Sequence, residues 1–312
     1  MSLIAALKGK GPNGFGYGST AEEVTAGIDL TGQTILVTGC NSGLGLETVR
    51  ALGLRGARVL ATARTIDKAQ AAVAGLQGNF VPLACELSEP AAVRACVEAV
   101  KSQAGALDVI LCNAGVMAIP TRQEAHGCEL HFLTNHIGHF ILVTGLLERL
   151  APAGRVVVVG SNAHRRAPAY GLDLDDLSGA RHPYHPMGAY GQSKLANILF
   201  TRELARRLGT PDPTAARRQT ANTLHPGVIA TNITRTIPSV AQLAMRTLSP
   251  LVLKTAAQGA ATQCYLATNP AVANVTGAYY ADCNPAETTP LGRDMALAAR
   301  LWEVSEQIAA RV

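Results

Sequence analysis

Tyr190 and Lys194 are the residues whose types and spacing point most directly to chemistry, since they lie four apart in Tyr190-Gly-Gln-Ser-Lys194. The surrounding pattern predicts a helix near 188–208, so both side chains share one face, roughly 6 Å apart along the axis. A free phenol has a pKa of about 10, and a neighbouring ammonium group favours its phenolate form. The pair therefore predicts acid/base catalysis at Tyr190, although seven tyrosines make the spacing alone weak evidence.

Two further polar residues stand where they can complete this site. Ser161 ends the apolar strand Val156-Val-Val-Val-Gly160, and Asn135 lies in the helical pattern His131–Phe140. A serine hydroxyl in such a place can donate to a substrate oxygen and stabilise charge that develops there. The candidate catalytic residues are Tyr190, Lys194, Ser161 and Asn135.

A glycine-rich turn links the first expected strand to the first long helix. The segment Thr38-Gly-Cys-Asn-Ser-Gly-Leu-Gly45 has the spacing G-x-x-x-G-x-G. Glycines allow a tight turn and close approach of the backbone to a pyrophosphate, while the helix N-terminus supplies N–H groups. The alternative is a purely structural turn, but the strand-to-helix context favours dinucleotide binding.

The choice of cofactor depends on the residues after the second strand. A carboxylate there would bond the ribose hydroxyls of NAD and repel the extra phosphate of NADP. This chain has Ala63-Arg64-Thr65, without an acid, and Arg64 can form charge-assisted bonds to a 2′-phosphate. NADP(H) is the predicted cofactor, with NAD(H) and a merely solvated Arg64 as the alternatives.

Apolar β-rich runs alternate with longer helical patterns from Gln33 onward, which is typical of βαβ units. The expected strands are Thr34–Thr38, Arg58–Ala63, Phe80–Ala84, Asp108–Cys112, Arg155–Gly160, Thr220–Leu224 and Ala278–Ala281. Helices are expected near 43–55, 67–76, 90–104, 124–150, 188–208, 255–268 and 294–310. The pattern predicts an α/β Rossmann fold, a doubly wound seven-stranded parallel sheet with helices on both faces.

No linker divides the chain, so we expect one domain over residues 31–312, preceded by a leader at 1–30. Within the leader, Ser19-Thr-Ala-Glu22 predicts a capping box that opens a short helix. Two stretches interrupt the alternation, a substrate loop at 165–189 and an apolar lid with a basic edge at 230–254. Specificity is expected in these stretches.

Bulk composition narrows the class of protein further. Hydrophobic residues make up 48% of the 312 residues and the net charge is only +5. No long basic run is present, so nucleic acid is not an expected partner. Seven scattered cysteines without a Cys-x-x-Cys pair favour buried free thiols that fill the core, and Cys283, near the rim of the active site, is the expected exception. No apolar stretch is long enough to predict a transmembrane segment. A cytoplasmic protein is expected.

The motifs together resemble the short-chain dehydrogenase/reductase family, in its retinol-dehydrogenase and WW-domain-oxidoreductase branch. The resemblance covers about residues 30–282. Its motifs are Thr38–Gly45, Asn113-Ala-Gly115, Asn135-His-x-Gly-His-Phe140, Ser161-x-Ala-His164, Tyr190-x-x-Ser-Lys-Leu-Ala196 and His225-Pro-Gly227. The leader from Gly14 to Glu23 is also similar to that of plant and bacterial members.

This resemblance implies roles for the candidate residues. Tyr190 would exchange a proton with a carbonyl or alcohol oxygen, and Lys194 would lower the tyrosine pKa and bond the nicotinamide ribose. Ser161 would orient the substrate, and Asn135 would hold a water that relays protons. The implied cofactor-binding residues are Gly39, Asn41, Ser42, Gly43, Leu44, Gly45, Arg64, Glu86, Leu87, Asn113, Ala114, Gly115, Tyr190, Lys194, Pro226, Gly227, Val228 and Thr231.

Three positions depart from the family pattern without touching the catalytic set. Cys112 replaces an asparagine, Gly160 replaces a serine, and Glu86 stands where an aspartate is usual near the adenine. His131, Asn135 and His139 recur every four residues, but no acidic or cysteine partner supports a metal there.

The predicted function is interconversion of a carbonyl and an alcohol on a bulky, fairly apolar small molecule. The alternatives are an NADP(H)-binding sensor or scaffold protein with little catalysis, and a reductase of C=C bonds. The family resemblance also leaves open a homo-oligomer formed through the helices near 124–150 and 188–208.

Overall fold

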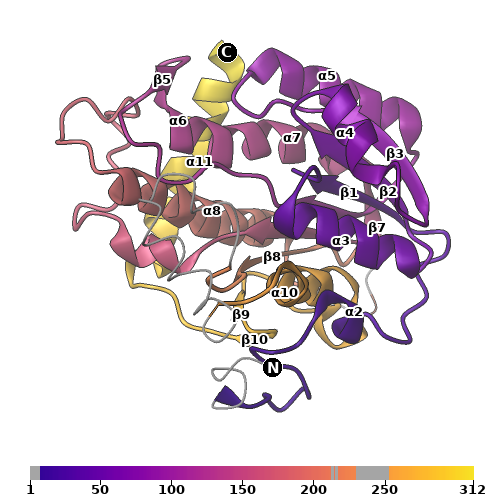
Figure 1. Ribbon diagram of the computed structural model, residues 1–312. Helices are drawn as coiled ribbons and strands as arrows, with labels where there is room; N and C mark the ends of the chain where they lie inside the picture. Colours follow the sequence, from indigo (N-terminus) through magenta and orange to yellow (C-terminus); the bar gives the residue numbers. More distant parts are fainter. Residues whose placement is uncertain (1–7, 212–213, 215–216, 230–252) are drawn as a thin grey trace, which may run out of the picture.

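The seven parallel strands predicted from the sequence are confirmed in a computed structural model, which describes residues 8–211, 214, 217–229 and 253–312. The sheet order is β10-β9-β8-β7-β4-β1-β2-β3, and Figure 1 shows helices on both of its faces. The parallel strands are β1 (Thr34–Thr38), β2 (Arg58–Ala63), β3 (Asn79–Ala84), β4 (Leu107–Cys112), β7 (Leu150–Val159), β8 (Thr220–His225) and β9 (Tyr279–Ala281). A two-residue antiparallel strand, β10 (Asn284–Pro285), extends the edge beyond the prediction.

Each face of the sheet has its own hydrophobic core. One core lies under α2 (Ala21–Val24), α3 (Gly43–Leu54) and α10 (Ala256–Thr268). The other lies under α5 (Pro90–Gln103), α7 (Gly138–Leu146), α8 (Pro186–Leu208) and α11 (Met295–Arg311), while α4 (Ile66–Val73) packs near the β2–β3 edge. Strands buried on both faces explain the continuous runs of Val, Ile and Leu.

The strand order reverses direction at β1, which places a crevice at the carboxyl ends of β1 and β4. After β1 the chain adds β2 and β3 on one side, then crosses back to form β4 on the other. The turns that follow β1 and β4 meet there, because a Cβ on Gly39 would lie 2.8 Å from Cα of Ala114. Such a reversal is where α/β sheets bind dinucleotides.

The capping box in the leader is shifted by one residue from the prediction. Thr20 is the N-cap of α2, its side chain accepts from the backbone of Glu23, and the Glu23 carboxylate accepts from the Thr20 N–H. The Ser19 hydroxyl accepts instead from the N–H of Gly16. The leader lies beside α10 and the β9–β10 edge of the sheet (Figure 1).

The predicted helix at 124–150 begins later than expected. Residues 124–129 form a small hairpin of β5 (Glu124–Ala125) and β6 (Cys128–Glu129), whose turn residues His126 and Gly127 both have positive φ. Helix α6 (Leu130–Phe132), a π-helical turn η1 (Leu133–Ile137) and α7 then follow, and a 3₁₀ turn η2 (Leu147–Arg149) leads into β7.

Among the described residues, one helical stretch, Leu130–Arg149, is long and apolar enough by composition to cross a membrane. Seventy-eight per cent of its most apolar window is buried inside the fold. Its place in the hydrophobic core accounts for its composition.

Helix α11 covers the outer surface of α7 and α8. The Trp302 ring lies 5.0 Å from the Phe140 ring and 5.7 Å from the Phe200 ring, and the His136 ring bonds the Ser305 hydroxyl at 2.8 Å. The homo-oligomer through these two helices stays a prediction. The predicted lid at 230–254 lies outside the described residues except for its last two positions.

Candidate active site

Helix α8 carries Tyr190 and Lys194 toward the carboxyl end of β7. His185 caps the helix, whose first residue is Pro186, an arrangement that favours initiation because proline needs no N–H partner there. Lys194 is 3% exposed, and its ammonium donates to the carbonyl of Val159 at 2.8 Å and lies 5.8 Å from the centre of the Tyr190 ring. The structure therefore brings the predicted pair together in a mostly dry environment.

The acidities of this pair differ from the simple expectation. Burial raises the pKa of Tyr190, and its hydrogen bond with Ser161 acts in the opposite direction. Burial also lowers the pKa of Lys194 to about 8. Burial therefore dominates the acidity of Tyr190 in the protein without cofactor, and the role of Lys194 in favouring the phenolate beside an oxidised nicotinamide stays a prediction.

Asn135 comes from the π-helical turn η1 and is fully buried. Its Oδ1 accepts from the N–H of Val116 at 2.8 Å, and its Nδ2 donates to the carbonyl of Val116 and the hydroxyl of Ser193, both at 2.9 Å. Ser193 in turn donates to the carbonyl of Tyr190. The amide thus joins the loop after β4 to the catalytic helix, while its predicted role in holding a water stays a prediction.

A second polar chain joins this site to the glycine-rich turn. The Nδ1 of His139 bonds the carbonyl of Asn135 at 3.0 Å, so that nitrogen carries the proton, and Nε2 accepts from the Thr38 hydroxyl at 2.9 Å. Burial lowers the pKa of His139 to about 4, in keeping with a neutral ring. The Thr38 oxygen also accepts from the N–H groups of Asn113 and Ala114, each at 3.0 Å.

The turn after β1 fits a dinucleotide phosphate. Gly39 and Gly43 have φ values of +73° and +57°, and a Cβ on Gly45 would lie 2.1 Å from the carbonyl oxygen of Gly39. Ser42 is the N-cap of α3, yet its side chain makes no cap bond, and Asn41 and Ser42 are exposed. The first N–H groups of this twelve-residue helix therefore lie at the carboxyl end of β1, where the strand order reverses and a dinucleotide groove is expected, and they and the helix dipole favour an anion there.

The side chain of Asn113 is hydrogen-bonded to this turn and to α10. It donates to the carbonyl of Thr38 at 2.8 Å and accepts from Gln263 at 3.2 Å. Gly115 lies at the other end of the same segment, where a Cβ would stand 3.6 Å from the Lys194 ammonium. The predicted Asn113–Gly115 segment thus spans the floor of the groove.

Arg64 and Glu86 lie together just after the carboxyl ends of β2 and β3, at the end of the expected groove away from Lys194. The Arg64 side chain is 64% exposed, and its Nε is 3.8 Å from a Glu86 carboxylate oxygen. The other Glu86 oxygen accepts from Ser88 at 2.9 Å. Leu87 is buried instead against Gly138, so its side chain belongs to the core rather than to an open surface.

The remaining predicted cofactor residues follow β8. Pro226 is buried, Gly227 has a φ of +95°, and Val228 is 60% exposed, whereas Thr231 lies outside the described residues. On the neighbouring strand, a Cβ on Gly160 would lie 2.9 Å from both the Leu224 carbonyl and the Thr223 hydroxyl. Local crowding therefore explains why glycine suits this position.

Three side chains hold the loop after β4 as a wall of the site. Asn135 bonds Val116 as described above. His131 Nε2 accepts from the N–H of Ile119 at 3.2 Å, and the Tyr184 hydroxyl donates to the carbonyl of Ile119 at 2.7 Å. The His131 ring lies 6.0 Å from the Tyr190 ring and bonds the Glu129 carboxylate at 2.7 Å. Met117 projects from this wall with 38% of its surface exposed.

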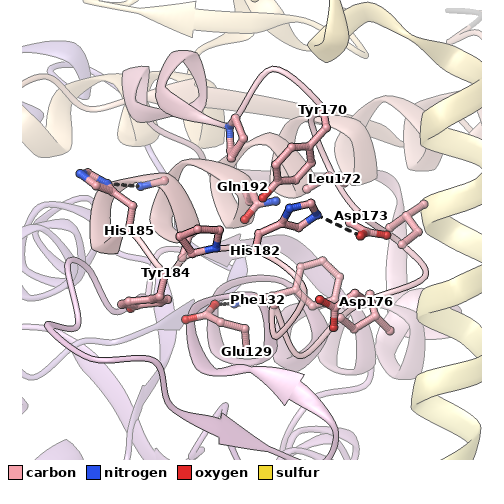
Figure 2. A pocket seen from close by; sticks show the side chains of 17 residues that line it. Glu129, Phe132, Tyr170, Leu172, Asp173, Asp176, His182, Tyr184, His185 and Gln192 are labelled. Atoms are coloured by element: carbon pink, nitrogen blue, oxygen red, sulfur yellow. Dashed lines mark hydrogen bonds and ion pairs between the residues drawn. The ribbon is translucent and has the colours of Figure 1, made fainter.

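Residues of the predicted substrate loop line a separate cavity, shown in Figure 2. The His182 ring stacks on Tyr170 at 4.2 Å and bonds Asp173 at 3.3 Å, while His185 caps α8 and His164 is buried away from the cavity. The cavity meets α8 at Gly188, Ala189 and Gln192, on a different side of the helix from Tyr190 and Lys194. No member of the catalytic set lines it.

The cysteine prediction is confirmed in its main part, since all seven cysteines are free and buried. Cys283 is fully buried as well, so the expectation that it is the exception to core packing is wrong. Sequence reasoning also missed Thr38, His139, Ser193 and Gln263 as positioning residues. Their signal was the presence of a polar side chain within a strand or helix that is otherwise buried.

Comparisons with known proteins agree with this geometry. The family model described as short chain dehydrogenase matches residues 33–171. The chain is 35% identical to the short-chain dehydrogenase TIC 32 A, chloroplastic, of Brassica napus, over 98% of both chains. It is 42% identical to a probable oxidoreductase of Streptomyces antibioticus (88% of this chain, 97% of the other) and 38% identical to mouse retinol dehydrogenase 14 (89% and 86%).

Solved structures show the same likeness. A crystal structure of a protein from Mycobacterium paratuberculosis matches with a TM-score of 0.74 and 32% identity, covering 94% of this chain and 98% of that one. A short chain dehydrogenase from Burkholderia cenocepacia in complex with NADP matches with a TM-score of 0.61 and 25% identity, covering 80% and 96%. The chain belongs to the short-chain dehydrogenase/reductase family of oxidoreductases, in a retinol dehydrogenase-like branch.

Proposed function

We propose that the protein is an NADP(H)-dependent reductase or dehydrogenase that interconverts a carbonyl and an alcohol. The observation that carries the proposal is the pairing of Tyr190 with the buried ammonium of Lys194, with Ser161 near enough to lower the pKa of the same tyrosine. This set stands at the opposite end of the Asn113–Gly115 floor from the glycine-rich turn. A nicotinamide bound in the groove would supply or accept a hydride.

Tyr190 acts as the proton donor to the carbonyl oxygen in the reducing direction. Because burial raises its pKa, the phenol is protonated at neutral pH, which is the form that reduction requires. Ser161 donates a hydrogen bond to the same substrate oxygen and stabilises the negative charge that develops on it. Lys194, with its pKa at about 8, is mostly cationic at neutral pH and favours the phenolate left after proton transfer.

The preference for NADP(H) over NAD(H) rests on Arg64. Its guanidinium is exposed at the end of β2, and its contact with Glu86 at 3.8 Å is long enough to be exchanged for a phosphate. The Burkholderia relative that binds NADP supports a nicotinamide cofactor in this fold.

A bulky, fairly apolar substrate is supported by the residues beside the catalytic set. Met117 follows the backbone that Asn135 holds, and Val228 follows Gly227, so exposed apolar side chains stand on two sides of the site. Burying such surface against an apolar ligand would be favourable. Seven free thiols further support residence in a reducing compartment such as the cytoplasm.

The test combines cofactor binding with turnover. Fluorescence titration should show tighter binding of NADPH than of NADH, and a panel of carbonyl compounds and alcohols should reveal turnover. The Tyr190→Phe variant should bind NADPH almost unchanged and lose about 10³-fold or more of the rate, because it lacks only the exchangeable proton.

A control is Tyr170→Phe, which removes the hydroxyl of an exposed tyrosine that lines the separate cavity. This control should keep the wild-type rate. Retention of most activity by Tyr190→Phe would overturn the mechanism, while tight NADPH binding without turnover on any compound would favour a sensor.

A further inference from the structure

A buried lysine lies beneath the turn that follows β8. Lys254 is 1% exposed, its backbone N–H donates to the carbonyl of Val228 at 2.9 Å, and it pairs with Ile229 in an isolated parallel bridge. Its side chain passes directly under Gly227, where a Cβ would lie 2.7 Å from the lysine Cδ and 2.9 Å from Cε. The shape of the Pro226–Gly227 turn therefore depends on this side chain.

The ammonium group of Lys254 is paired with a carboxylate on a constrained turn. Its Nζ lies 2.6 Å from Oδ1 of Asp282, and it stands 4.8 Å from the centre of the Tyr17 ring. Asp282 and Cys283 form the two-residue turn between β9 and β10, with φ values of +51° and +63°. Positive φ is uncommon for residues other than glycine, so the surroundings must hold this turn in place.

Several groups outside the turn hold it. The Cys283 N–H donates to the hydroxyl of Thr262 in α10 at 3.1 Å, and the Cys283 carbonyl accepts from Asn13 in the leader at 2.7 Å. Asn284 then bonds the leader carbonyl of Phe15 at 3.1 Å. The carboxylate of Asp282 is thus held at a fixed point, and the buried lysine is held with it.

The other side of the same turn reaches the catalytic residues. His225 precedes Pro226, and its Nδ1 accepts from the N–H of Asn162, the residue after Ser161, at 3.1 Å. Burial lowers the pKa of His225 to about 4, so the ring stays neutral and can accept this bond. The Pro226–Gly227 backbone therefore connects the two sides. His225 on one side bonds the residue after Ser161, and Lys254 on the other pairs with Asp282.

We propose that Lys254 and Asp282 are positioning residues that fix the Pro226–Gly227 backbone against the nicotinamide half of the cofactor. The inference rests on the proposed function, since it needs a dinucleotide in the groove. It also assigns a role to the contacts between the leader and the β9–β10 turn. These contacts hold Asp282, the carboxylate partner of Lys254. Neither residue touches the reacting atoms.

The test separates the two halves of the cofactor. Lys254→Met removes the charge and keeps much of the stem under Gly227, while Asp282→Asn removes the partner charge in a residue type that tolerates positive φ. Each variant should bind NADPH about tenfold more weakly, as expected when the backbone beside the catalytic residues is displaced from the nicotinamide half. Binding of 2′,5′-ADP, which lacks the nicotinamide half, should change by less than about twofold.

Lys101→Met is the matched control, because Lys101 pairs with Glu98 and Glu148 on the outer surface away from this turn. It should leave both affinities unchanged. Equal weakening of NADPH and 2′,5′-ADP, or no change in either, would overturn the inference. If Lys254→Met does not fold, Asp282→Asn carries the test alone.

Failure of the proposed function would be visible in the wild-type protein. If the wild-type chain prefers NADH and 5′-ADP, the proposed NADP(H) preference is wrong. The role of Lys254 and Asp282 would then be tested by comparing the same variants for binding of NADH and 5′-ADP. A wild-type chain that binds no dinucleotide would overturn both proposals together.

Discussion

The two ends of the cofactor groove present opposite environments. At the catalytic end, Lys194 is 3% exposed and Asn135 is fully buried, and their polar atoms are bonded to other protein groups. At the other end, Arg64 is 64% exposed and meets Glu86 at 3.8 Å. Charge at the buried end is therefore strongly coupled to its neighbours, whereas charge at the exposed end is screened by water.

This difference sets the size of the effects expected from substitutions. A buried cation has a displaced pKa and alters both stability and turnover, while an exposed ion pair is worth little by itself and matters when a ligand replaces water around it. The variants below test that contrast, from the buried end to the exposed end.

Replacement of Lys194 by Met should have the largest effect. The rate should fall by about 10³-fold or more, because the tyrosine loses the cation that favours its phenolate. The folded protein should nevertheless gain between about 1 and 3 kcal/mol in its free energy of unfolding at pH 7, since a buried ammonium with a pKa of about 8 is removed. Steady-state kinetics and chemical denaturation would measure the two effects.

The sign of the pH dependence follows from the lowered pKa. The unfolded lysine keeps its proton up to its ordinary pKa of 10.5, whereas the folded one loses it near pH 8. Wild-type stability should therefore rise between about pH 8 and 10.5, and the advantage of Lys194→Met should shrink over that window. A constant difference across this range would show that Lys194 titrates normally.

Thr38→Val should give the next largest effect, confined to stability. The hydroxyl accepts from two part-buried N–H groups and donates to His139. An isosteric apolar side chain leaves the Ala114 N–H and the His139 ring nitrogen without this partner, while the Asn113 N–H keeps its bond to the carbonyl of Leu111. We expect a loss of about 2–3 kcal/mol in the free energy of unfolding, measured by denaturation. Thr144→Val, which removes a bond from a hydroxyl to a helix carbonyl, is the control and should cost much less. Equal losses of stability in the two variants would show that the bond between Thr38 and His139 contributes no more than an ordinary hydroxyl-to-carbonyl bond.

The sequence predicted the strands of this groove well because strands buried on both faces require continuous runs of β-branched and apolar residues. It predicted the glycine-rich turn because close backbone contacts exclude side chains there. It could not predict the bond between Thr38 and His139, which are 101 residues apart, or the ion pair between Lys254 and Asp282. Such pairs depend on the order of the strands in space, which hydrophobic periodicity does not encode.

Two local errors have local causes. Both Ser19 and Thr20 are suitable caps, and each is followed three residues later by a glutamate, so two registers of the capping box were available. The structure uses the Thr20 register because Ser19 bonds Gly16. The hairpin at 124–129 carried a signal in His126-Gly127, but the apolar helical pattern that follows it concealed the turn.

At the exposed end, Arg64→Ala should weaken NADPH binding by about tenfold and leave NADH binding unchanged, because only NADPH carries the 2′-phosphate. Lys68→Ala removes an exposed positive charge from the adjoining helix and should change neither affinity by a comparable amount. Titration with both cofactors would measure the difference. An equal loss for NADPH and NADH would assign Arg64 to the adenosine rather than to the phosphate.

Glu86→Gln should have the smallest effect and the opposite sign. The carboxylate stands 3.8 Å from the Arg64 guanidinium and adds negative charge where the phosphate is expected to bind. Glutamine can keep the bond to Ser88 while it removes that charge, so NADPH should bind about two- to fivefold more tightly, with NADH little changed. Because both groups are partly exposed, this gain should fall as salt concentration increases. If the gain in NADPH affinity persists at about 1 M salt, the charges of Arg64 and Glu86 are screened less than their exposure to water implies. The two ends of the groove would then not differ in the way described above.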